Sequence, residues 1–383
     1  MKKILFYTAN GVGLGHLQRA HLIAEKIRFK NIEIALVTSA RSPQIFGKFF
    51  HRLIRLIPLS DELLFDPPKT LAARLANGKK LARVFKNYQP DLVIADFYLT
   101  SLFTFYPFGH ALKQFPVKSI FIWRLGDDKS VCRSLKNEQT KLNLFERIIL
   151  PHSRQELADF LSREALNQTV NDRRFKICGP IYRRPDKMKL VNCRKKYRIS
   201  ANDFLITITL GGGGKLDGGQ CDNPDKVIND FVSIFPQLQK DIPNLRIVVS
   251  TGPYFKLERK YAKIKGIDMV TFEPNLLELM SLSKIVICPV GYNTCNELIQ
   301  IKRPAILIPL MRGNREQFVR AKYFKKQNVA KIYNGNSPKK LLKLILECKN
   351  DLAIMESNYS NFPDNRNGIN QVTGIILNLL NKT

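Results

Sequence analysis

Three segments of the 383-residue chain place glycines or reactive side chains directly after apolar runs. The first reads Gly11-Val12-Gly13-Leu14-Gly15-His16. Its glycines let backbone N–H groups approach an anion closely, and the N-terminus of a following helix favours negative charge. The same helix end disfavours an imidazolium, so we expect His16 to stay neutral and to accept a proton from a hydroxyl nucleophile. A capping or core role for His16 is the alternative.

This first segment does not have the pattern of a dinucleotide site. Its spacing is GxGxG rather than GxGxxG, and a dinucleotide-binding unit also needs an acid at the end of the second strand. The corresponding residues, 37–41, contain no carboxylate. Binding of NADP through Arg41 is the alternative that remains.

The second segment is the run Gly211-Gly212-Gly213-Gly214, followed by Lys215 and Leu216. A P-loop would need Ser or Thr after the lysine to hold magnesium. Four consecutive glycines cost more conformational entropy than a simple turn requires, which favours close approach of the backbone to a phosphate. A tight turn without a ligand is the alternative.

The third segment, residues 288–321, combines a turn, a helix start and a carboxylate. Gly291 follows an apolar run, and Asn293 or Thr294 is expected to cap the next helix. Glu297 then lies one turn into that helix, facing the mouth of the loop. A carboxylate there can accept both hydroxyls of a ribose while the helix N-terminus receives a diphosphate.

Polar groups also occupy the ends of two other predicted elements. Glu316 and Gln317 open a further helix, where their side chains are suited to contact sugar hydroxyls. Asp96 ends the apolar run 90–96, which predicts a carboxylate at the carboxyl edge of a sheet.

The apolar runs and the helical periodicity between them predict the elements that position these groups. A strand, a helix over 16–29 and a second strand form a unit that predicts a parallel sheet with a right-handed crossover. The same pattern starts again later in the chain, so we expect an α/β protein with two doubly wound domains. The predicted strands are 3–9, 32–38, 90–96, 117–123, 204–210, 246–250, 269–272, 285–288 and 305–309.

The segment 179–185 has two prolines and a glycine, which suits a hinge between the two domains. We therefore expect an N-terminal, acceptor-binding domain over 1–180 and a C-terminal, donor-binding domain over 181–365. A C-terminal helix over about 366–383 is a candidate to pack back on the first domain.

Composition narrows the class of partner. The formal net charge of +30 attracts anions such as nucleic acid, lipid headgroups or phosphorylated substrates, although a merely soluble basic surface is the alternative. Two segments, 49–59 and 73–88, are basic and apolar together, which suits either a membrane surface or packing on a sheet. Nucleic-acid recognition motifs are absent, and the seven cysteines lack CxxC spacing, which favours a cytoplasmic protein without a zinc site.

The third segment resembles the donor-site signature of glycosyltransferase family 28, the MurG-like enzymes. It is most similar to an uncharacterised branch that carries GYNT followed by EQxxRA. The resemblance continues, in order, through GVGLGHLQR, GPIYRRP and the glycine run. It implies the GT-B fold, with two Rossmann-like domains facing each other across a cleft.

The resemblance also implies residue roles. Glu297 would bind the ribose, Glu316 and Gln317 the donor sugar, and Arg183 the phosphates. His16 would be the base, with Asp96 orienting it or the acceptor. The remaining matched positions are Gly212, Gly213, Gly214, Gly291, Tyr292, Asn293 and Thr294 for the donor, and Gly13 and Gly15 for the acceptor.

The sequence departs from the family pattern at two positions. Val290 stands where related enzymes place a serine, which removes one hydroxyl donor to the phosphates. Glu316 stands where they often place glutamine or histidine, and its added negative charge suggests a different sugar.

The expected function is an inverting, metal-independent transfer of a sugar from a UDP-linked donor to a hydroxyl acceptor, without a cofactor. The acceptor is unspecified, with a lipid-linked or anionic molecule favoured, and association with the inner face of an anionic membrane is considered. Binding of nucleic acid is not expected. The alternatives are a nucleotide-sugar hydrolase or epimerase on the same fold, or a non-catalytic nucleotide-sugar or nucleic-acid binding protein.

Overall fold

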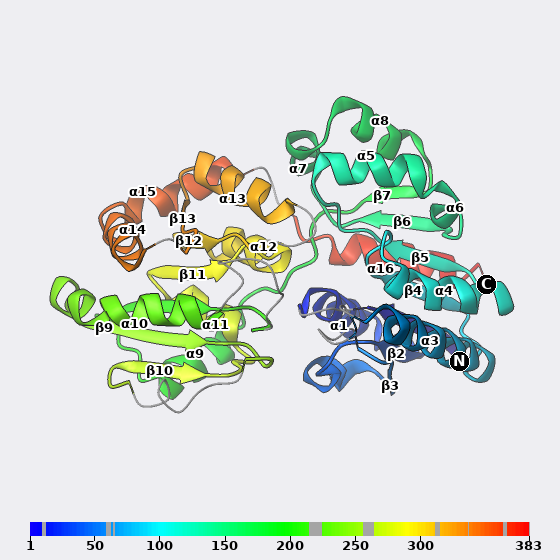
Figure 1. The fold of residues 1–383 in the computed structure, drawn as a ribbon, viewed down its shortest axis with the longest axis horizontal. Helices are drawn as coiled ribbons and strands as arrows, with labels where there is room; N and C mark the ends of the chain where they lie inside the picture. Colours follow the sequence, from blue (N-terminus) through cyan, green and yellow to red (C-terminus); the bar gives the residue numbers. More distant parts are fainter. Residues whose placement is uncertain are drawn as a thin grey trace. The chain divides into compact units, whose positions relative to one another are not determined.

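The computed structural model describes residues 1–9, 13–58, 63, 66–213, 224–255, 264–310, 315–335, 337–362 and 366–382. The chain forms two compact units (Figure 1). Unit 1 comprises Met1–Tyr182 together with Asp364–Thr383, and unit 2 comprises Arg183–Pro363. Among the described residues, none of the helices is long and apolar enough to cross a membrane.

Unit 1 is built on a parallel sheet of seven strands in the order β3-β2-β1-β4-β5-β6-β7. Both faces of its central strands are buried, because alternate residues of each apolar run pack on opposite sides. Ile4 and Phe6 pack on one face, whereas Leu5 and Tyr7 pack on the other. The strands are β1 (Lys2–Thr8), β2 (Ile32–Thr38), β3 (Arg52–Arg55), β4 (Leu92–Asp96), β5 (Ser119–Ile122), β6 (Arg147–Leu150) and β7 (Phe175–Ile177).

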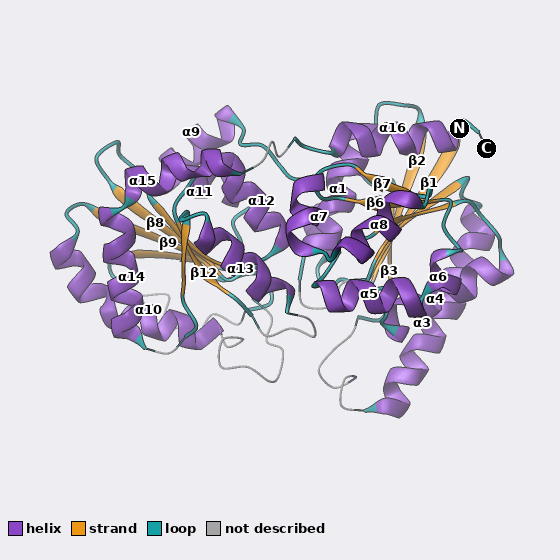
Figure 2. Ribbon diagram, turned by 90° about the horizontal axis from the view of Figure 1, so that it is seen from above, coloured by secondary structure: helices purple, strands orange, loops and turns teal. Residues whose placement is uncertain are grey.

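Helices cover both faces of this sheet (Figure 2). Helices α1 and α16 contribute to the core that contains Ile4, and α3 and α4 to the core that contains Leu5. The helical elements of unit 1 are α1 (Gly15–Ile27), η1 (Pro43–Phe49), α3 (Pro67–Tyr88), α4 (Leu102–Gln114), α5 (Asp128–Asn137), α6 (Gln139–Leu142), α7 (Arg154–Phe160), α8 (Arg163–Asn171) and α16 (Ile369–Leu380).

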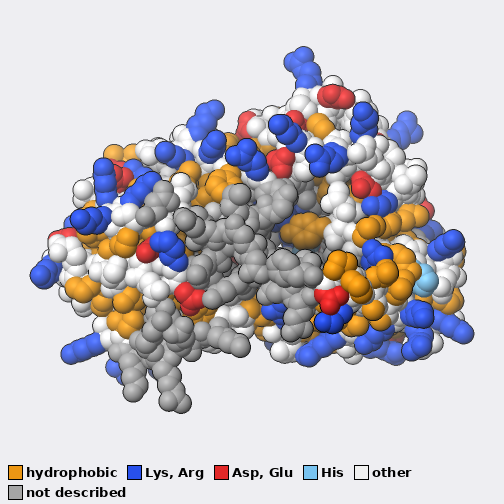
Figure 3. Space-filling view, in the orientation of Figure 1, with side chains coloured by type: hydrophobic (Ala, Val, Ile, Leu, Met, Phe, Trp, Pro, Cys, Tyr) orange, Lys and Arg blue, Asp and Glu red, His pale blue; other side chains and the backbone are white. Residues whose placement is uncertain are grey.

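The basic, apolar segment 73–88 belongs to α3. Leu81, Phe85 and Tyr88 are buried against the sheet, as the packing interpretation expects, whereas Leu75 is exposed. Its charges remain at the surface, and Figure 3 shows lysine and arginine side chains spread over the visible face of the molecule.

The segment through which the chain leaves unit 1 and the segment through which it returns are hydrogen-bonded to each other within that unit. The N–H of Gly368 donates to the Pro180 carbonyl at 2.8 Å, and Asn367 Nδ2 donates to the Tyr182 carbonyl at 2.6 Å. The backbones approach so closely that a Cβ on Gly368 would lie 2.2 Å from the Cys178 carbonyl oxygen. Helix α16 then continues along unit 1 and packs beside α1.

Unit 2 has a parallel sheet of six strands in the order β10-β9-β8-β11-β12-β13. The strands are β8 (Phe204–Thr209), β9 (Leu245–Ser250), β10 (Ile267–Val270), β11 (Ile285–Pro289), β12 (Ala305–Ile308) and β13 (Ala330–Ile332). Its helical elements are α9 (Lys187–Lys196), α10 (Pro224–Asp241), α11 (Leu276–Leu282), α12 (Tyr292–Ile301), α13 (Glu316–Lys326), α14 (Pro338–Asn350), α15 (Leu352–Ser357) and η3 (Asn358–Asn361).

The two sheets share one topological feature. In unit 1 the strand order reverses between β1 and β4, and in unit 2 it reverses between β8 and β11. Ligands of open parallel sheets bind outside the carboxyl ends of the strands at such switch points, because the loops on either side diverge there. His16, Asp96, the glycine run and the segment from Gly291 to Glu297 lie at or after the ends of these four strands, whereas Glu316 and Gln317 follow β12. The fold class expected from the sequence, two doubly wound α/β domains, is confirmed.

Candidate active site

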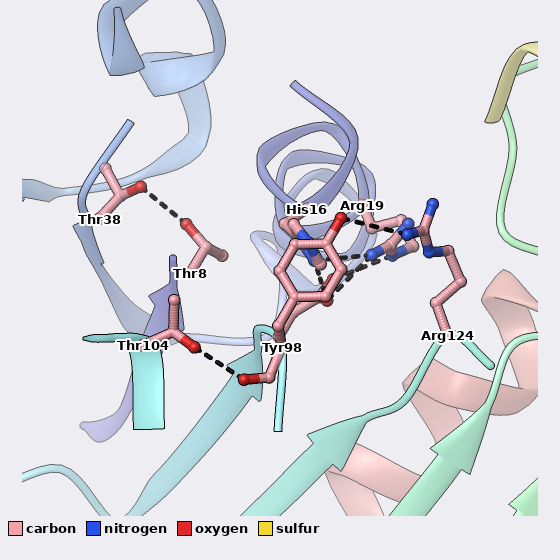
Figure 4. A network of polar contacts seen from close by, with 8 residues as sticks. Thr8, His16, Arg19, Thr38, Tyr98, Thr104 and Arg124 are labelled. Carbon is pink, nitrogen blue, oxygen red and sulfur yellow. Dashed lines mark hydrogen bonds and ion pairs between the residues drawn. The ribbon is translucent and has the colours of Figure 1, made fainter. Parts of the chain in front are cut away.

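The switch point of unit 1 brings His16 and Asp96 together. Asp96 is the last residue of β4, and His16 is the second residue of α1, which follows β1. The Nδ1 atom of His16 contacts Oδ1 of Asp96 in a very short hydrogen bond. Both residues are buried, and Figure 4 shows His16 beside Arg19 and Tyr98. This contact is the one expected if Asp96 orients the ring of His16, which is one of the two roles predicted for it.

Arg19, one turn further along α1, completes this group and was missed in the sequence. Its Nε donates to Oδ2 of Asp96 at 2.9 Å, and its Nη2 donates to Oδ1 at 2.9 Å. Only 1% of Arg19 is exposed. The spacing of three residues between His16 and Arg19 was the available signal, because it places both on one face of a helix.

The surroundings fix the protonation of this group. Burial lowers the pKa of His16, the nearby charges of Arg19 and Arg124 lower it further, and Asp96 opposes them. Burial alone would raise the pKa of Asp96, but the charge of Arg19 and the contact with His16 hold it at about 2. Asp96 is therefore ionised, Nδ1 of the neutral ring carries the proton, and Nε2 carries the lone pair.

Tyr98 and Arg124 line the same place. The ring of Tyr98 meets that of His16 edge to face, with centroids 5.1 Å apart. Arg124, which follows β5, donates from Nη2 to the Tyr98 hydroxyl at 3.3 Å (Figure 4). Neither residue was predicted, although both follow the ends of predicted strands. Gly15 opens α1 and Gly13 lies just before it, whereas Gly11 and Val12 lie outside the described residues.

The glycine run of unit 2 follows β8, beside the loop that follows β9. Gly211 and Gly213 have φ angles of +64° and +71°, a region that favours glycine. The Gly212 carbonyl accepts from the N–H of Tyr254 at 3.0 Å, and a Cβ on Gly213 would lie 2.3 Å from the Thr251 carbonyl oxygen. Backbone packing thus accounts for part of the glycine requirement. Gly214 lies outside the described residues.

Helix α12 begins earlier than expected. Its N-cap is Gly291, so the expectation that Asn293 or Thr294 caps the helix is wrong. Tyr292, Asn293 and Thr294 instead form the first turn. A glycine cap has no side chain to accept from the first-turn N–H groups, which leaves this helix end suited to an anionic ligand.

Glu297 and Arg183 pair directly. Nε of Arg183 donates to Oε1 of Glu297 at 3.0 Å, and Nη1 donates to the Pro274 carbonyl at 3.5 Å. Glu297 is 4% exposed. Both residues were expected to meet different parts of one donor, and the structure brings them into contact.

Glu316 and Gln317 occupy the first turn of α13. Nη1 of Arg320 donates to Oε1 of Glu316 at 2.6 Å, and both side chains are buried. The added negative charge of Glu316 is therefore compensated by Arg320, which the sequence analysis missed despite the four-residue spacing that signals such a pair. The guanidinium of Arg320 also lies 5.4 Å from the ring centroid of Tyr292. Gln317 Oε1 accepts from the N–H of Leu310 at 3.0 Å.

Comparison with known proteins finds similar glycosyltransferases. Residues 223–370 match the Glycosyltransferase family 28 C-terminal domain. The chain is 23% identical to a UDP-N-acetylglucosamine--N-acetylmuramyl-(pentapeptide) pyrophosphoryl-undecaprenol N-acetylglucosamine transferase of Fusobacterium nucleatum subsp. nucleatum, over 91% of this chain and 89% of that protein. A protein of the same name from Alkaliphilus metalliredigens is 24% identical, over 82% and 81%.

Solved structures share the fold. The kitacinnamycin glycotransferase superposes with a TM-score of 0.66 at 13% identity, covering 99% of this chain and 98% of that one. For MurG of Acinetobacter baumannii the values are 0.59 and 15%, covering 98% and 99%. A UDP-GlcNAc 2-epimerase of Neisseria meningitidis, bound to UDP-GlcNAc, gives 0.64 and 14%, covering 100% of both chains. The chain is a glycosyltransferase with two Rossmann-like domains; it is similar to MurG-like enzymes, and residues 223–370 match the C-terminal domain of glycosyltransferase family 28.

Proposed function

We propose that this enzyme transfers a sugar from a UDP-linked donor to a hydroxyl acceptor, with inversion at the anomeric carbon and without a metal ion. The observation that carries the proposal is the buried pair of His16 and Asp96 at the switch point of unit 1. The names of the relatives, which specify UDP-N-acetylglucosamine as the donor and a pyrophosphoryl-undecaprenol acceptor, support the donor class.

The chemistry follows from the protonation of His16. The acceptor oxygen attacks the anomeric carbon from the side opposite the diphosphate, and Nε2 of His16 takes the hydroxyl proton. The bond between the anomeric carbon and the diphosphate oxygen breaks, and the nucleoside diphosphate leaves with that electron pair. Asp96 stabilises the imidazolium formed at His16 and keeps Nδ1 protonated throughout. Displacement from the opposite side inverts the anomeric configuration.

The donor is assigned to the carboxyl edge of the unit 2 sheet. The N-terminus of α12 and the amides near Gly212 and Gly213 would receive the diphosphate and stabilise the charge that develops as it leaves. Glu297 would accept the ribose hydroxyls. Its buried pairing with Arg183 holds the carboxylate in place and sets a guanidinium beside the nucleotide.

The donor sugar is assigned to the first turn of α13. Glu316 and Gln317 are both buried there, and the contacts with Arg320 and the Leu310 N–H fix their orientations. A carboxylate held by an arginine accepts hydrogen bonds from sugar hydroxyls. We therefore expect the preferred sugar to present hydroxyls, not an added negative charge, to Glu316.

The acceptor is proposed to be lipid-linked or anionic, and the enzyme to act at the cytoplasmic face of a membrane. The formal net charge of +30 and the lipid-linked acceptor in the names of the relatives support this assignment.

The test is a panel of UDP-, GDP- and dTDP-sugars, first in a thermal-shift assay and then with candidate acceptors. The proposal expects stabilisation by UDP and by one UDP-sugar, followed by transfer with inverted anomeric configuration that persists in EDTA. No stabilisation by any nucleotide would contradict the donor assignment. Rapid release of free sugar, or formation of an epimer without an acceptor, would instead favour a hydrolase or epimerase.

A further inference from the structure

We infer that Arg19 is a positioning residue for His16: it holds the Asp96 carboxylate in register with Nδ1 and balances its charge, so that the ring stays neutral with Nε2 available to the acceptor. The inference rests on the proposed role of His16 as the base. It concerns a buried residue to which the proposed mechanism assigns no contact with the substrates.

The geometry of the contact supports this role. The guanidinium of Arg19 uses two nitrogens, and each donates to a different oxygen of Asp96 at 2.9 Å. A bidentate pair fixes both the distance and the rotation of a carboxylate, which a single contact does not. Oδ1 of Asp96 also accepts the hydrogen bond from Nδ1 of His16. The carboxylate that Arg19 orients therefore orients the imidazole in turn.

The groups that face His16 come from three elements. Asp96 ends β4 and the neutral Tyr98 follows it, Arg19 lies on α1, and Arg124 follows β5. The negative charge of Asp96 would by itself favour an imidazolium, which cannot accept a proton. Nη2 of Arg19 lies 2.9 Å from Nδ1, so its positive charge directly opposes that tendency. Arg124 acts in the same direction.

A purely structural arginine would serve a different purpose. An ionised carboxylate as buried as Asp96 requires a partner whatever its function, and Arg19 supplies one. What distinguishes a positioning role is the ionisation of His16, which a structural role would leave unchanged. The experiment therefore measures that ionisation directly.

The histidine Cε1–H resonances of the full-length protein are followed by NMR from pH 4.5 to 9 in wild type and in Arg19→Met, Arg19→Lys and the double variant Arg19→Met/Asp96→Asn. The sequence has five histidines, and His16→Gln assigns the resonance of interest. We expect Arg19→Met to raise the His16 pKa by about 1 to 2, because Asp96 loses its counter-charge. Arg19→Lys should keep it near the wild-type value, and the double variant should reverse the increase.

Activity supplies the second readout. In Arg19→Met the acid limb of the kcat profile should move to higher pH together with the NMR value, while Arg19→Lys should keep the limb and lower kcat several-fold. If Arg19→Met does not fold, Arg19→Gln, which also lacks the positive charge, replaces it and is expected to raise the His16 pKa in the same direction. An unchanged His16 titration in the folded variant that lacks the charge would overturn the inference. Because the titration needs no substrate, it is distinct from a failure of the transfer assay.

Discussion

At the scale of single residues, the proposed chemistry depends on which ring nitrogen of His16 carries the proton. Asp96 is held ionised, and its contact with Nδ1 leaves the lone pair of His16 on Nε2. Burial also disfavours the imidazolium, so the ring remains a base at neutral pH. The sequence predicted His16 from its position behind a glycine turn, but the charge balance that tunes it depends on Arg19 and Arg124, which lie on different elements.

Replacing the base should separate turnover from binding. We expect His16→Ala to lower kcat by about 10²- to 10⁴-fold, the usual contribution of a general base. Calorimetry should give an unchanged Kd for UDP, because the nucleotide is assigned to unit 2. His110→Ala, on α4, is the matched control and should behave as wild type. Equal losses of binding and turnover in His16→Ala would indicate a structural histidine.

The pH dependence has a defined sign. Transfer requires neutral His16, whose pKa lies below the ordinary value of 6.5. The kcat should therefore stay constant as the pH falls from 8 to about 6.5, and decline only at more acidic values as the imidazole takes up a proton. Initial rates at saturating donor and acceptor measure this. A decline that begins above pH 7 would contradict a depressed His16 pKa.

The buried carboxylate of unit 2 gives the corresponding prediction for the nucleotide. Glu297→Gln should weaken UDP binding by about 1.5–3 kcal/mol, because charge-assisted hydrogen bonds to the ribose are lost. Deoxyuridine diphosphate should lose less affinity in the variant than UDP does, since it already lacks one hydroxyl. Calorimetry on both ligands checks this, and equal losses would argue against ribose recognition.

Secondary-structure elements decide which backbone groups face the ligand. Helix α12 begins at Tyr292 behind a glycine N-cap, so its first turn, not a side-chain cap, meets the carboxyl edge of the sheet. The glycines after β8 are required partly by the loop after β9. Two properties therefore explain these glycines: they pack tightly against the loop after β9, and they would let the backbone approach a phosphate.

The close approach of Gly368, just before α16, to the backbone of Cys178 and Gly179 can be tested with a pair of glycine substitutions. Gly368→Ala should lower the free energy of unfolding by more than about 2 kcal/mol, because its Cβ would clash with fixed backbone oxygens. Gly374→Ala, within α16, is the control: nothing lies within 4 Å of its Cβ, and the helix should gain about 0.5–1 kcal/mol. Urea unfolding measures both. A Gly368→Ala protein as stable as wild type would contradict the close approach.

At the scale of the whole molecule, two units with separate cores are joined by two chain segments, and the molecule carries a formal net charge of +30. Such a charge creates a field that attracts anionic ligands over distances comparable to the Debye length. This property belongs to the complete chain, not to either site alone.

The field predicts a salt effect on association. The association rate constant for UDP should fall by about 3- to 10-fold between low ionic strength and ~300 mM salt, with a much smaller change in the dissociation rate constant. Stopped-flow mixing measures both, and uridine serves as the uncharged control. A rate constant for UDP that does not change with salt would contradict steering by the net charge.

The sequence alone determined the two α/β series and the strand ends at or after which His16, Asp96 and Glu297 lie, because apolar runs and glycine turns are local signals. It did not determine which side chains meet. Arg19 lies 77 residues from Asp96, and Arg183 lies 114 residues from Glu297. The first contact exists because parallel pairing sets β1 beside β4, and both contacts exist because a buried charge requires an opposite charge. Only the tertiary structure decides those two conditions, and with them the ionisation of the proposed base.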